Sequence, residues 1–316
     1  MVCLGPFLLV MKVMILKDGL DLEKLIKNAS QAKTLALDTE TTGLDYMDSD
    51  LVGISMSFTP GEAFYIPINH KDDTSPQLDM DYVLEELRPL LEDSKQKIIG
   101  QNIKFDMNIL SQHGINISSI KNDTMMMSYV LDASATRHNL DALSSYYLGY
   151  KTSTFEDVAG KGVKQVTFDE VSIADATNYA AEDADITLRL YEGLLSKLES
   201  VESLKKLNED IEIPLIEVLS EMEQNGAVLN SKILNAQSKD LENRIKKIEK
   251  KAYVLAGDEF NLGSTKQLRE IFFDKLGYRV IKKTPGGQPS TDEKVLAELA
   301  EEYELPKILL EHRTLS

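Results

Sequence analysis

Cysteine is almost absent from this chain of 316 residues: Cys3 is the single one, so no internal disulfide can form. The four histidines are dispersed, and no Cys/His spacing indicates a zinc site. They are His70, His113, His138 and His312. This pattern fits a reducing compartment, and we expect a cytoplasmic protein.

Long apolar runs are also missing. The run from Val2 to Leu16 is interrupted by Gly5, Pro6 and Lys12, and it has no basic start and no small-residue cleavage site. Such a run indicates neither a secretory signal nor a membrane span. We expect an initial β-strand there instead, and no association with a membrane.

Positive charge is scarce, because the formal net charge is −17, with 35 Lys and Arg against 52 Asp and Glu. Residues 204–316 carry 18 basic and 20 acidic side chains, which leaves 17 basic and 32 acidic for residues 1–203. Proteins that bind duplex nucleic acid usually present a basic surface to the phosphates. The acidic first part therefore predicts weak affinity for duplex DNA.

The length and the hydrophobic content of 42% predict two domains with substantial cores. Up to about residue 200, expected strands alternate with expected helices, which is typical of an α/β layer structure. They include a helix at 20–30 with Asp21 as its N-cap, a hairpin of strands at 51–58 and 63–68, and helices at 103–112 and 125–131. Beyond the charged segment 199–209, which we expect to mark a domain boundary, successive helices follow one another with Gly or Pro between them, the longest over 231–256. We therefore expect one domain over residues 1–203 and a second, α-helical one over residues 204–316.

The stretch Thr-Leu-Ala-Leu-Asp-Thr-Glu-Thr-Thr-Gly-Leu, residues 34–44, begins as a buried strand. Side chains alternate along a strand, so Asp38 and Glu40 leave its end on one face and Thr39 on the other. Two converging carboxylates favour an oxygen-ligated ion, Mg²⁺ or Mn²⁺. The alternative is a polar exit from the strand, closed by Gly43.

Two later stretches carry further candidates. Ile-Ile-Gly-Gln-Asn-Ile-Lys-Phe-Asp, residues 98–106, predicts a second buried strand that runs into a helix with Asp106 in its first turn. Tyr-Ala-Ala-Glu-Asp-Ala-Asp, residues 179–185, lies in a helical pattern. There, Tyr179 and Asp183 are four residues apart and share one face of the helix.

Together these stretches resemble the three exonuclease motifs of the DEDD superfamily, in the variant whose third motif is Tyr-x-x-x-Asp. The stretches at 138–143, 154–162, 260–268 and 282–287 are also similar to the bacterial DNA polymerase I family. The resemblance runs from about Thr34 to the last residue and corresponds to the first half of the large, Klenow-type fragment. It implies a ribonuclease-H-like mixed sheet of five strands with flanking helices, followed by an incomplete α-helical thumb.

The resemblance also implies 3′→5′ exonuclease activity with two divalent ions, on single-stranded or frayed 3′ ends of DNA. Asp38, Glu40 and Asp183 would hold the metal that activates water, and Asp38 and Asp106 would place the second metal at the leaving oxygen. Tyr179 would orient the attacking water. The implied contacts to the DNA strand are Leu44, Gln101, Asn102, Arg137 and Phe155.

Each of these contacts also has a structural interpretation. Leu44 and Phe155 are apolar and could be core residues. Asn102 could cap the helix that follows it, and Arg137 could pair with a surface carboxylate. The sequence leaves these alternatives open.

Two other functions compete with the proofreading exonuclease. The intact motifs argue against a catalytically silent module, and the thumb-like second half argues against an RNA-trimming relative. The aspartate motifs with which the family adds nucleotides do not occur in these residues. We therefore expect a protein that shortens DNA and does not extend it. We also expect it to be a monomer.

Overall fold

The computed structural model describes residues 11–16, 18–72, 75–117 and 119–316. The chain divides into two compact units, the first ending at Gly226 and the second comprising Ala227–Ser316. Helices α8 (Glu202–Leu207) and α9 (Ile213–Asn225) pack on α7 (Ile173–Glu199) and α3 (Ile103–Gln112) of the first unit, so the predicted boundary at 203/204 lies inside that unit. The assignment of the two domains stays a prediction.

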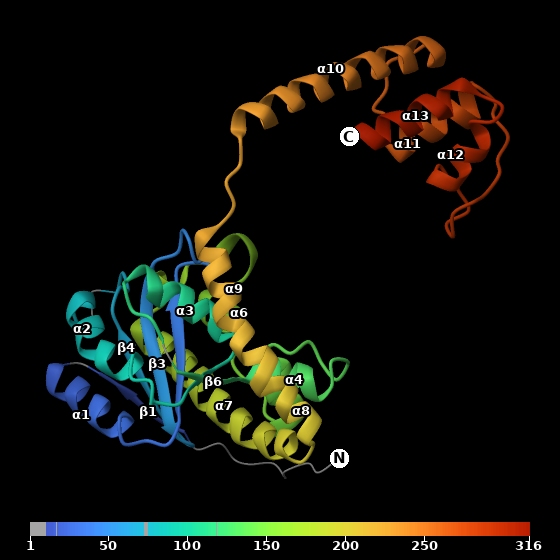
Figure 1. Cartoon of the computed structure of the whole chain (residues 1–316). Helices are drawn as coiled ribbons and strands as arrows, with labels where there is room; N and C mark the ends of the chain where they lie inside the picture. Colours follow the sequence, from blue (N-terminus) through green and yellow to red (C-terminus); the bar gives the residue numbers. More distant parts are fainter. Residues whose placement is uncertain (1–10, 17, 73–74, 118) are drawn as a thin grey trace. The chain divides into compact units, whose positions relative to one another are not determined.

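The first unit is built on one mixed sheet of six strands in the order β1-β4-β3-β2-β5-β6 (Figure 1). Strands β1 and β4 pair in parallel, as do β2 with β5 and β5 with β6, whereas β3 pairs antiparallel with both β2 and β4. The strands are β1 (Lys12–Ile15), β2 (Leu35–Thr41), β3 (Leu51–Thr59), β4 (Glu62–Pro67), β5 (Ile98–Gly100) and β6 (Ile120–Asp123).

The predicted mixed α/β architecture is confirmed, with one correction to the strand count. The sheet has six strands and not five, because the expected initial strand pairs with β4 at its edge. Only part of that prediction can be compared, since residues 1–10 lie outside the described residues.

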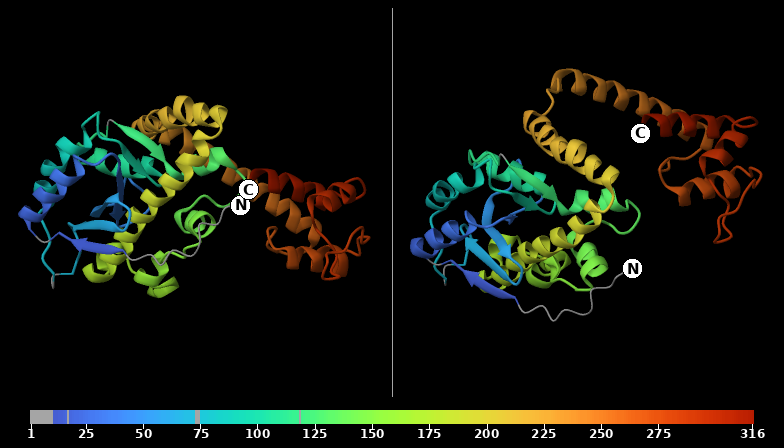
Figure 2. Two further views of the ribbon diagram at one scale, coloured as in Figure 1. Left: turned by 90° about the horizontal axis from the view of Figure 1, so that it is seen from below. Right: turned by 60° about the horizontal axis from the view of Figure 1, so that its bottom comes forward.

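Helices cover both faces of the sheet (Figure 2). Helix α7 runs across one face and touches strands β1 to β5. Helices α1, α2 and α3 bury the opposite face. The helices of the first unit are α1 (Gly19–Ala29), α2 (Met80–Leu91), α3 (Ile103–Gln112), α4 (Thr124–Leu131), α5 (Leu140–Leu143), α6 (Phe155–Ala159), α7 (Ile173–Glu199), α8 (Glu202–Leu207) and α9 (Ile213–Asn225).

The alternation of side chains along β2 sorts them between these two layers. Leu35 and Leu37 pack with α1 and α2, whereas Ala36 packs with α7 and α4. The period of two then carries Asp38 and Glu40 to the α7 face and Thr39 to the α3 face. Strand β2 lies between β3 and β5, but it pairs with β5 only at Leu35 and Ala36, so its polar end is held by β3.

The second unit is helical and has its own core. Ile248 and Ala252 of α10 pack against Phe272, Leu296 and other buried apolar residues from the following helices. Its helices are α10 (Ser231–Ala256), α11 (Thr265–Arg269), α12 (Glu293–Leu299) and α13 (Glu304–Leu315). Across both units, no helix among the described residues is long and apolar enough to cross a membrane.

Candidate active site

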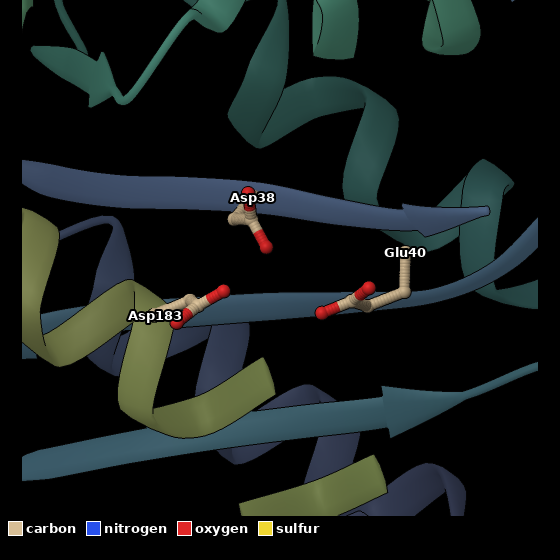
Figure 3. A group of neighbouring side chains, drawn as sticks. All are labelled: Asp38, Glu40 and Asp183. Atoms are coloured by element: carbon tan, nitrogen blue, oxygen red, sulfur yellow. The ribbon is translucent and has the colours of Figure 1, made fainter. Parts of the chain in front are cut away.

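Three carboxylates meet between β2 and α7. Asp38 and Glu40 point from the strand toward α7, and Asp183 points back toward them from its helix (Figure 3). One oxygen of each side chain lies within 4.8 Å of one oxygen of each of the others. The structure therefore brings together three of the five predicted motif residues at one point.

The ring of Tyr65 packs closely against strand β3 next to the carboxylates. Gly53 of β3 lies opposite Glu40 in the strand register. A Cβ at Gly53 would lie 2.1 Å from the hydroxyl oxygen of Tyr65, so only glycine leaves room for that ring. The phenol of Tyr65 is buried and donates a hydrogen bond of 2.7 Å to Nε2 of His70.

The three carboxylates are electrostatically strained. Burial raises the pKa of Asp38 to about 7, opposed by a hydrogen bond from Ser55. Burial, followed by the charges of Asp38 and Asp183, raises the pKa of Glu40 well above its ordinary value. The pKa of Asp183 is raised in the same direction, first by burial and then by Asp38.

This environment suits a divalent cation. Oε1 of Glu40 is buried and has no hydrogen-bond partner within the described part of the chain. Carboxylate oxygens are the ligands that Mg²⁺ and Mn²⁺ prefer, and a cation among like charges would favour their ionised forms. The donor set and the unpaired oxygen therefore fit a bound metal ion.

Asp106 is adjacent to this cluster but is not one of its three members. Its side chain is 3% exposed in the first turn of α3. Its Oδ1 accepts hydrogen bonds from the backbone N–H of Thr39 at 2.8 Å and from the Thr39 hydroxyl at 2.6 Å. Burial and then the charge of Asp38 raise the pKa of Asp106. Thr39 thus connects α3 to the strand that carries two of the clustered acids.

Tyr179 lies one helical turn before Asp183 and forms a side-chain hydrogen bond with it. Burial raises the pKa of the Tyr179 phenol, and the neighbouring charges of Asp183 and Glu40 raise it further. A phenol in this position keeps its proton at neutral pH and acts as a hydrogen-bond donor. This agrees with an orienting role and not with that of a base.

An open pocket of about 370 Å³ adjoins the acids. Three of the five predicted strand contacts line it, and one of them, Leu44, is 95% exposed, which excludes a core role for this side chain. The lining residues are Asp38, Thr39, Leu44, Gln101, Asn102, Phe105 and Asp106.

Gln101 and Asn102 are held by neighbouring groups. The Gln101 amide donates to the carbonyl of His138 at 2.8 Å and accepts from the hydroxyl of Thr124. Asn102 has a left-handed backbone with φ of 61°, and its side chain makes no capping hydrogen bond. Asn102 therefore occupies the N-cap position of α3, as its structural alternative expected, but it caps the helix without a side-chain hydrogen bond to the described residues.

Phe155 and Arg137 lie in other segments. Phe155 is the first residue of α6 and is 36% exposed, stacked against the buried ring of Phe168. Arg137 is exposed and directly precedes His138, which has a left-handed φ of 61°. The substrate roles of Leu44, Gln101, Asn102, Phe155 and Arg137 stay predictions.

Three further acids that the motifs did not single out hold the site in place. Asp123 accepts backbone N–H bonds from Asn102 and Ile103 at the start of α3 and from two residues at the start of α4. Asp123 is the N-cap of α4 and lies two residues before the helix expected at 125–131, so its capping role could be recognised in the sequence. Glu182 and Asp185 are the other two.

Glu182 and Asp185 flank Asp183 in the third motif. Glu182 accepts from the Tyr150 hydroxyl at 2.6 Å and from the backbone N–H of Ser153 at 2.7 Å. Asp185 accepts from the backbone N–H of Gly61 at 2.7 Å and from Arg189 at 2.8 Å. Their helical positions turn them away from Asp183, and only the tertiary structure reveals their partners.

A mixed sheet with clustered carboxylates at the end of its central strand defines a ribonuclease-H-like protein with a candidate metal centre. Comparison with known families gives a more specific assignment. The sequence model described as 3′-5′ exonuclease matches residues 13–199, and that described as DNA polymerase family A matches residues 231–316. The chain belongs to the 3′-5′ exonuclease family.

Curated relatives agree with this assignment. The chain is 48% identical to a DNA polymerase I of Pseudomonas aeruginosa, over 95% of this chain and 33% of that protein. It is 39% identical to a DNA polymerase I of Rhizobium leguminosarum, over 94% of this chain and 31% of the relative. The chain therefore spans about a third of the length of these relatives.

Among solved structures, the chain is similar to the POL domain of Pol1 from M. smegmatis in complex with a DNA primer-template and dNTP. The TM-score is 0.72 at 23% identity, covering 95% of this chain and 47% of that chain. At this level of identity the likeness establishes the fold alone.

Proposed function

We propose that this chain hydrolyses the terminal phosphodiester at 3′ ends of DNA and releases mononucleotides, as the proofreading exonuclease of a DNA polymerase I. The observation that carries the proposal is the group of Asp38, Glu40 and Asp183, with an unpaired buried oxygen on Glu40. Membership of the 3′-5′ exonuclease family supports the reaction and its direction.

Two Mg²⁺ or Mn²⁺ ions fit the acids. Asp38, Glu40 and Asp183 would hold the first, and Asp38 with Asp106 the second. Because Oδ1 of Asp106 accepts both bonds from Thr39, we assign its Oδ2 to the ion. Such a pair of ions lowers the pKa of the attacking water and stabilises the departing 3′ oxygen.

The chain's own side chains place the reactants. Tyr179 keeps its proton and donates a hydrogen bond, so its hydroxyl can orient the water beside Asp183. The exposed side chains of Leu44 and Phe155 would hold the last bases, because apolar contact and stacking are tolerant of sequence. Gln101, whose amide bonds the carbonyl of His138, and Asn102 would shape the strand's path, with Arg137 contributing a phosphate contact.

The substrate we propose is a single strand or a frayed end. The first part of the chain is acidic, which disfavours duplex binding, and unpairing a base from a duplex costs a few kcal/mol. We further propose a monomer that acts in the cytoplasm, with residues 1–203 as the exonuclease domain and residues 204–316 as thumb helices of the polymerase domain.

Digestion of end-labelled oligonucleotides tests this function. A 3′-labelled DNA strand in Mg²⁺ should lose its label as mononucleotide, and EDTA or Asp38→Asn should stop the release. An RNA strand of the same sequence, run in parallel, distinguishes the RNA-trimming alternative. Release of label that continues in EDTA, or preferred cleavage of the RNA, would contradict the proposal.

A further inference from the structure

One buried ring contacts two of the side chains assigned to the reaction. Phe168 is 1% exposed and lies in a short turn after α6. Its ring centroid is 6.3 Å from that of Phe155 with an interplanar angle of 24°, and 5.8 Å from that of Tyr179 with an angle of 52°. A third ring, that of His70, lies 5.7 Å away.

We propose that Phe168 is a positioning residue that sets both the base-stacking face of Phe155 and the hydroxyl of Tyr179. This inference rests on the proposed exonuclease function. We assign Phe168 itself no contact with the carboxylates or with the DNA strand. It acts through its two neighbours, one of which serves substrate binding and the other the chemical step.

The ring of Phe168 is well placed for this because its own segment is fixed. The backbone N–H of Lys71 donates to the carbonyl of Asp169 at 2.7 Å, and the Lys71 ammonium lies 2.8 Å from the carboxylate of Asp169. The carbonyl of Val171 accepts from Nδ1 of His70 at 3.1 Å. The residues that follow Phe168 are thereby attached to the loop after β4.

These contacts also fix the ring of His70, which packs against Phe168. A carbonyl can only accept, so Nδ1 of His70 carries the proton and Nε2 accepts from the hydroxyl of Tyr65. Both ring nitrogens are engaged, and the ring cannot turn without losing a buried hydrogen bond. Phe168 therefore packs against the His70 ring, whose orientation is fixed by two hydrogen bonds.

Phe155 depends on this support more than a core residue would. It opens a helix of five residues, and its side chain keeps 36% of its surface exposed. Its ring lies near-parallel to that of Phe168, and its exposed part is available to a base. Without the Phe168 ring, a side chain at the end of so short a helix would sample several rotamers.

Tyr179 has a comparable dependence. Its hydroxyl bonds Asp183, but its ring packs in the apolar cluster that Phe168 forms with Val52 and Ala176. Loss of the Phe168 ring leaves a void beside Tyr179 into which its ring can shift. Even a small displacement of an orienting group lowers the rate of the chemical step.

The Phe168→Leu variant tests the two effects separately. The energy of aromatic contacts of this kind corresponds to a change of about 2- to 10-fold in Kd and in kcat. The Kd for a single-stranded oligonucleotide, measured in EDTA, should rise by that factor, and kcat in Mg²⁺ should fall by a similar one. Phe168→Met, which refills more of the volume, replaces Leu if the first variant does not melt as a folded protein.

Double variants show whether Phe168 acts through its neighbours. In a Tyr179→Phe background, Phe168→Leu should have no further effect on kcat, and in a Phe155→Ala background it should have none on Kd. Effects that persist undiminished in both backgrounds would overturn the proposal, as would values within twofold of wild type in the single variant.

Phe272→Leu is the matched control, because Phe272 is fully buried and packs against two rings in the core of the second unit. It should change the melting temperature without changing Kd or kcat. Equal kinetic losses in both variants would reduce the effect of Phe168 to general destabilisation and refute the proposal. A wild-type chain that does not cleave DNA would instead refute the proposed function.

Discussion

The Asp38→Asn variant should be more stable than the wild-type chain when divalent cations are absent. Burial raises the pKa of Asp38 from its ordinary value of 3.8 to about 7. Between these pH values the folded chain binds a proton that the unfolded chain has released, so the free energy of unfolding falls as the pH rises from about 4 to about 7. Asparagine keeps the shape of the side chain and removes this pH-dependent penalty.

The pKa shift sets the magnitude of this effect. Each pKa unit corresponds to about 1.4 kcal/mol, so the full shift would be worth about 4 kcal/mol above pH 7. Asp38, Glu40 and Asp183 retain partial solvent exposure, which screens the interaction. We therefore expect a gain of about 2 kcal/mol. For a unit of this size that gain raises the melting temperature by roughly 4–8 °C.

Thermal unfolding in EDTA at pH 5 and pH 8 measures this gain. The advantage of Asp38→Asn should be largest at pH 8 and should shrink as the pH falls, because below about pH 3 wild-type Asp38 is protonated in both states. Mg²⁺ at about 100 times its Kd should stabilise the wild-type chain by about 2.7 kcal/mol and the variant by much less.

Asp185→Asn is the matched control for charge removal, two residues after Asp183 in the same helix. Asp185 is fully buried and accepts from Gly61 and Arg189, so its replacement should destabilise the chain at both pH values. An Asp38→Asn variant that melts at or below the wild-type temperature in EDTA at pH 8, or that responds fully to Mg²⁺, would refute the electrostatic reasoning.

Four further predictions concern single side chains and the substrate. Tyr179→Phe should lower kcat less than Asp183→Ala does, since the ligand set stays intact; equal losses in single-turnover assays would contradict an orienting role. Asp123→Ala should lower the free energy of unfolding by about 3 kcal/mol in urea titrations, because four backbone N–H groups lose their acceptor. Leu44→Ala should raise the KM for single strands without changing the melting temperature, since Leu44 is 95% exposed. Initial rates should decrease from single strand to mismatched end to matched duplex, and the reverse order would exclude this substrate class.

Many elements of both units could be predicted from local patterns. The helix expected over 103–112 is α3 with the same bounds, and the helix expected over 231–256 is α10. The expected hairpin appears as β3 and β4. In each case periodicity and a break or cap at the ends point to the same element, so local and tertiary preferences agree.

Local patterns did not predict the helix within a charged segment, nor which of two nearby aspartates caps a helix. The charged segment 199–209, expected as a boundary, contains helix α8, which packs against α7, and Asn208, which bonds Asn122. The N-cap of α1 is Asp18 and not the expected Asp21, whose own N–H donates to the Asp18 carboxylate. Two aspartates three residues apart offer the same signal, and only the geometry selects one of them.

The sequence likewise predicts the residues of the candidate site but not all of the contacts between them. Strand alternation was enough to place Asp38 and Glu40 on one face, and the motif resemblance added Asp106, Tyr179 and Asp183. The bonds from Thr39 to Asp106 join residues 67 positions apart, and no local pattern reveals them. Phe168 also contacts the ring of His70, which lies 98 positions earlier in the chain, and no local pattern reveals that contact either.

The distribution of hydrogen bonds among the acids distinguishes ligands from supports. Glu182 and Asp185, on either side of Asp183, each receive two hydrogen bonds, and the buried Asp123 receives four. Glu40, by contrast, keeps one buried oxygen without a partner among the residues that the structure describes. An unpaired buried acceptor is costly, and a cation beside Glu40 would supply the missing partner. The acids that flank the cluster hold its helix and strands in position, and the raised pKa values of Asp38, Glu40, Asp183 and the adjacent Asp106 show that negative charge there would be stabilised by a cation.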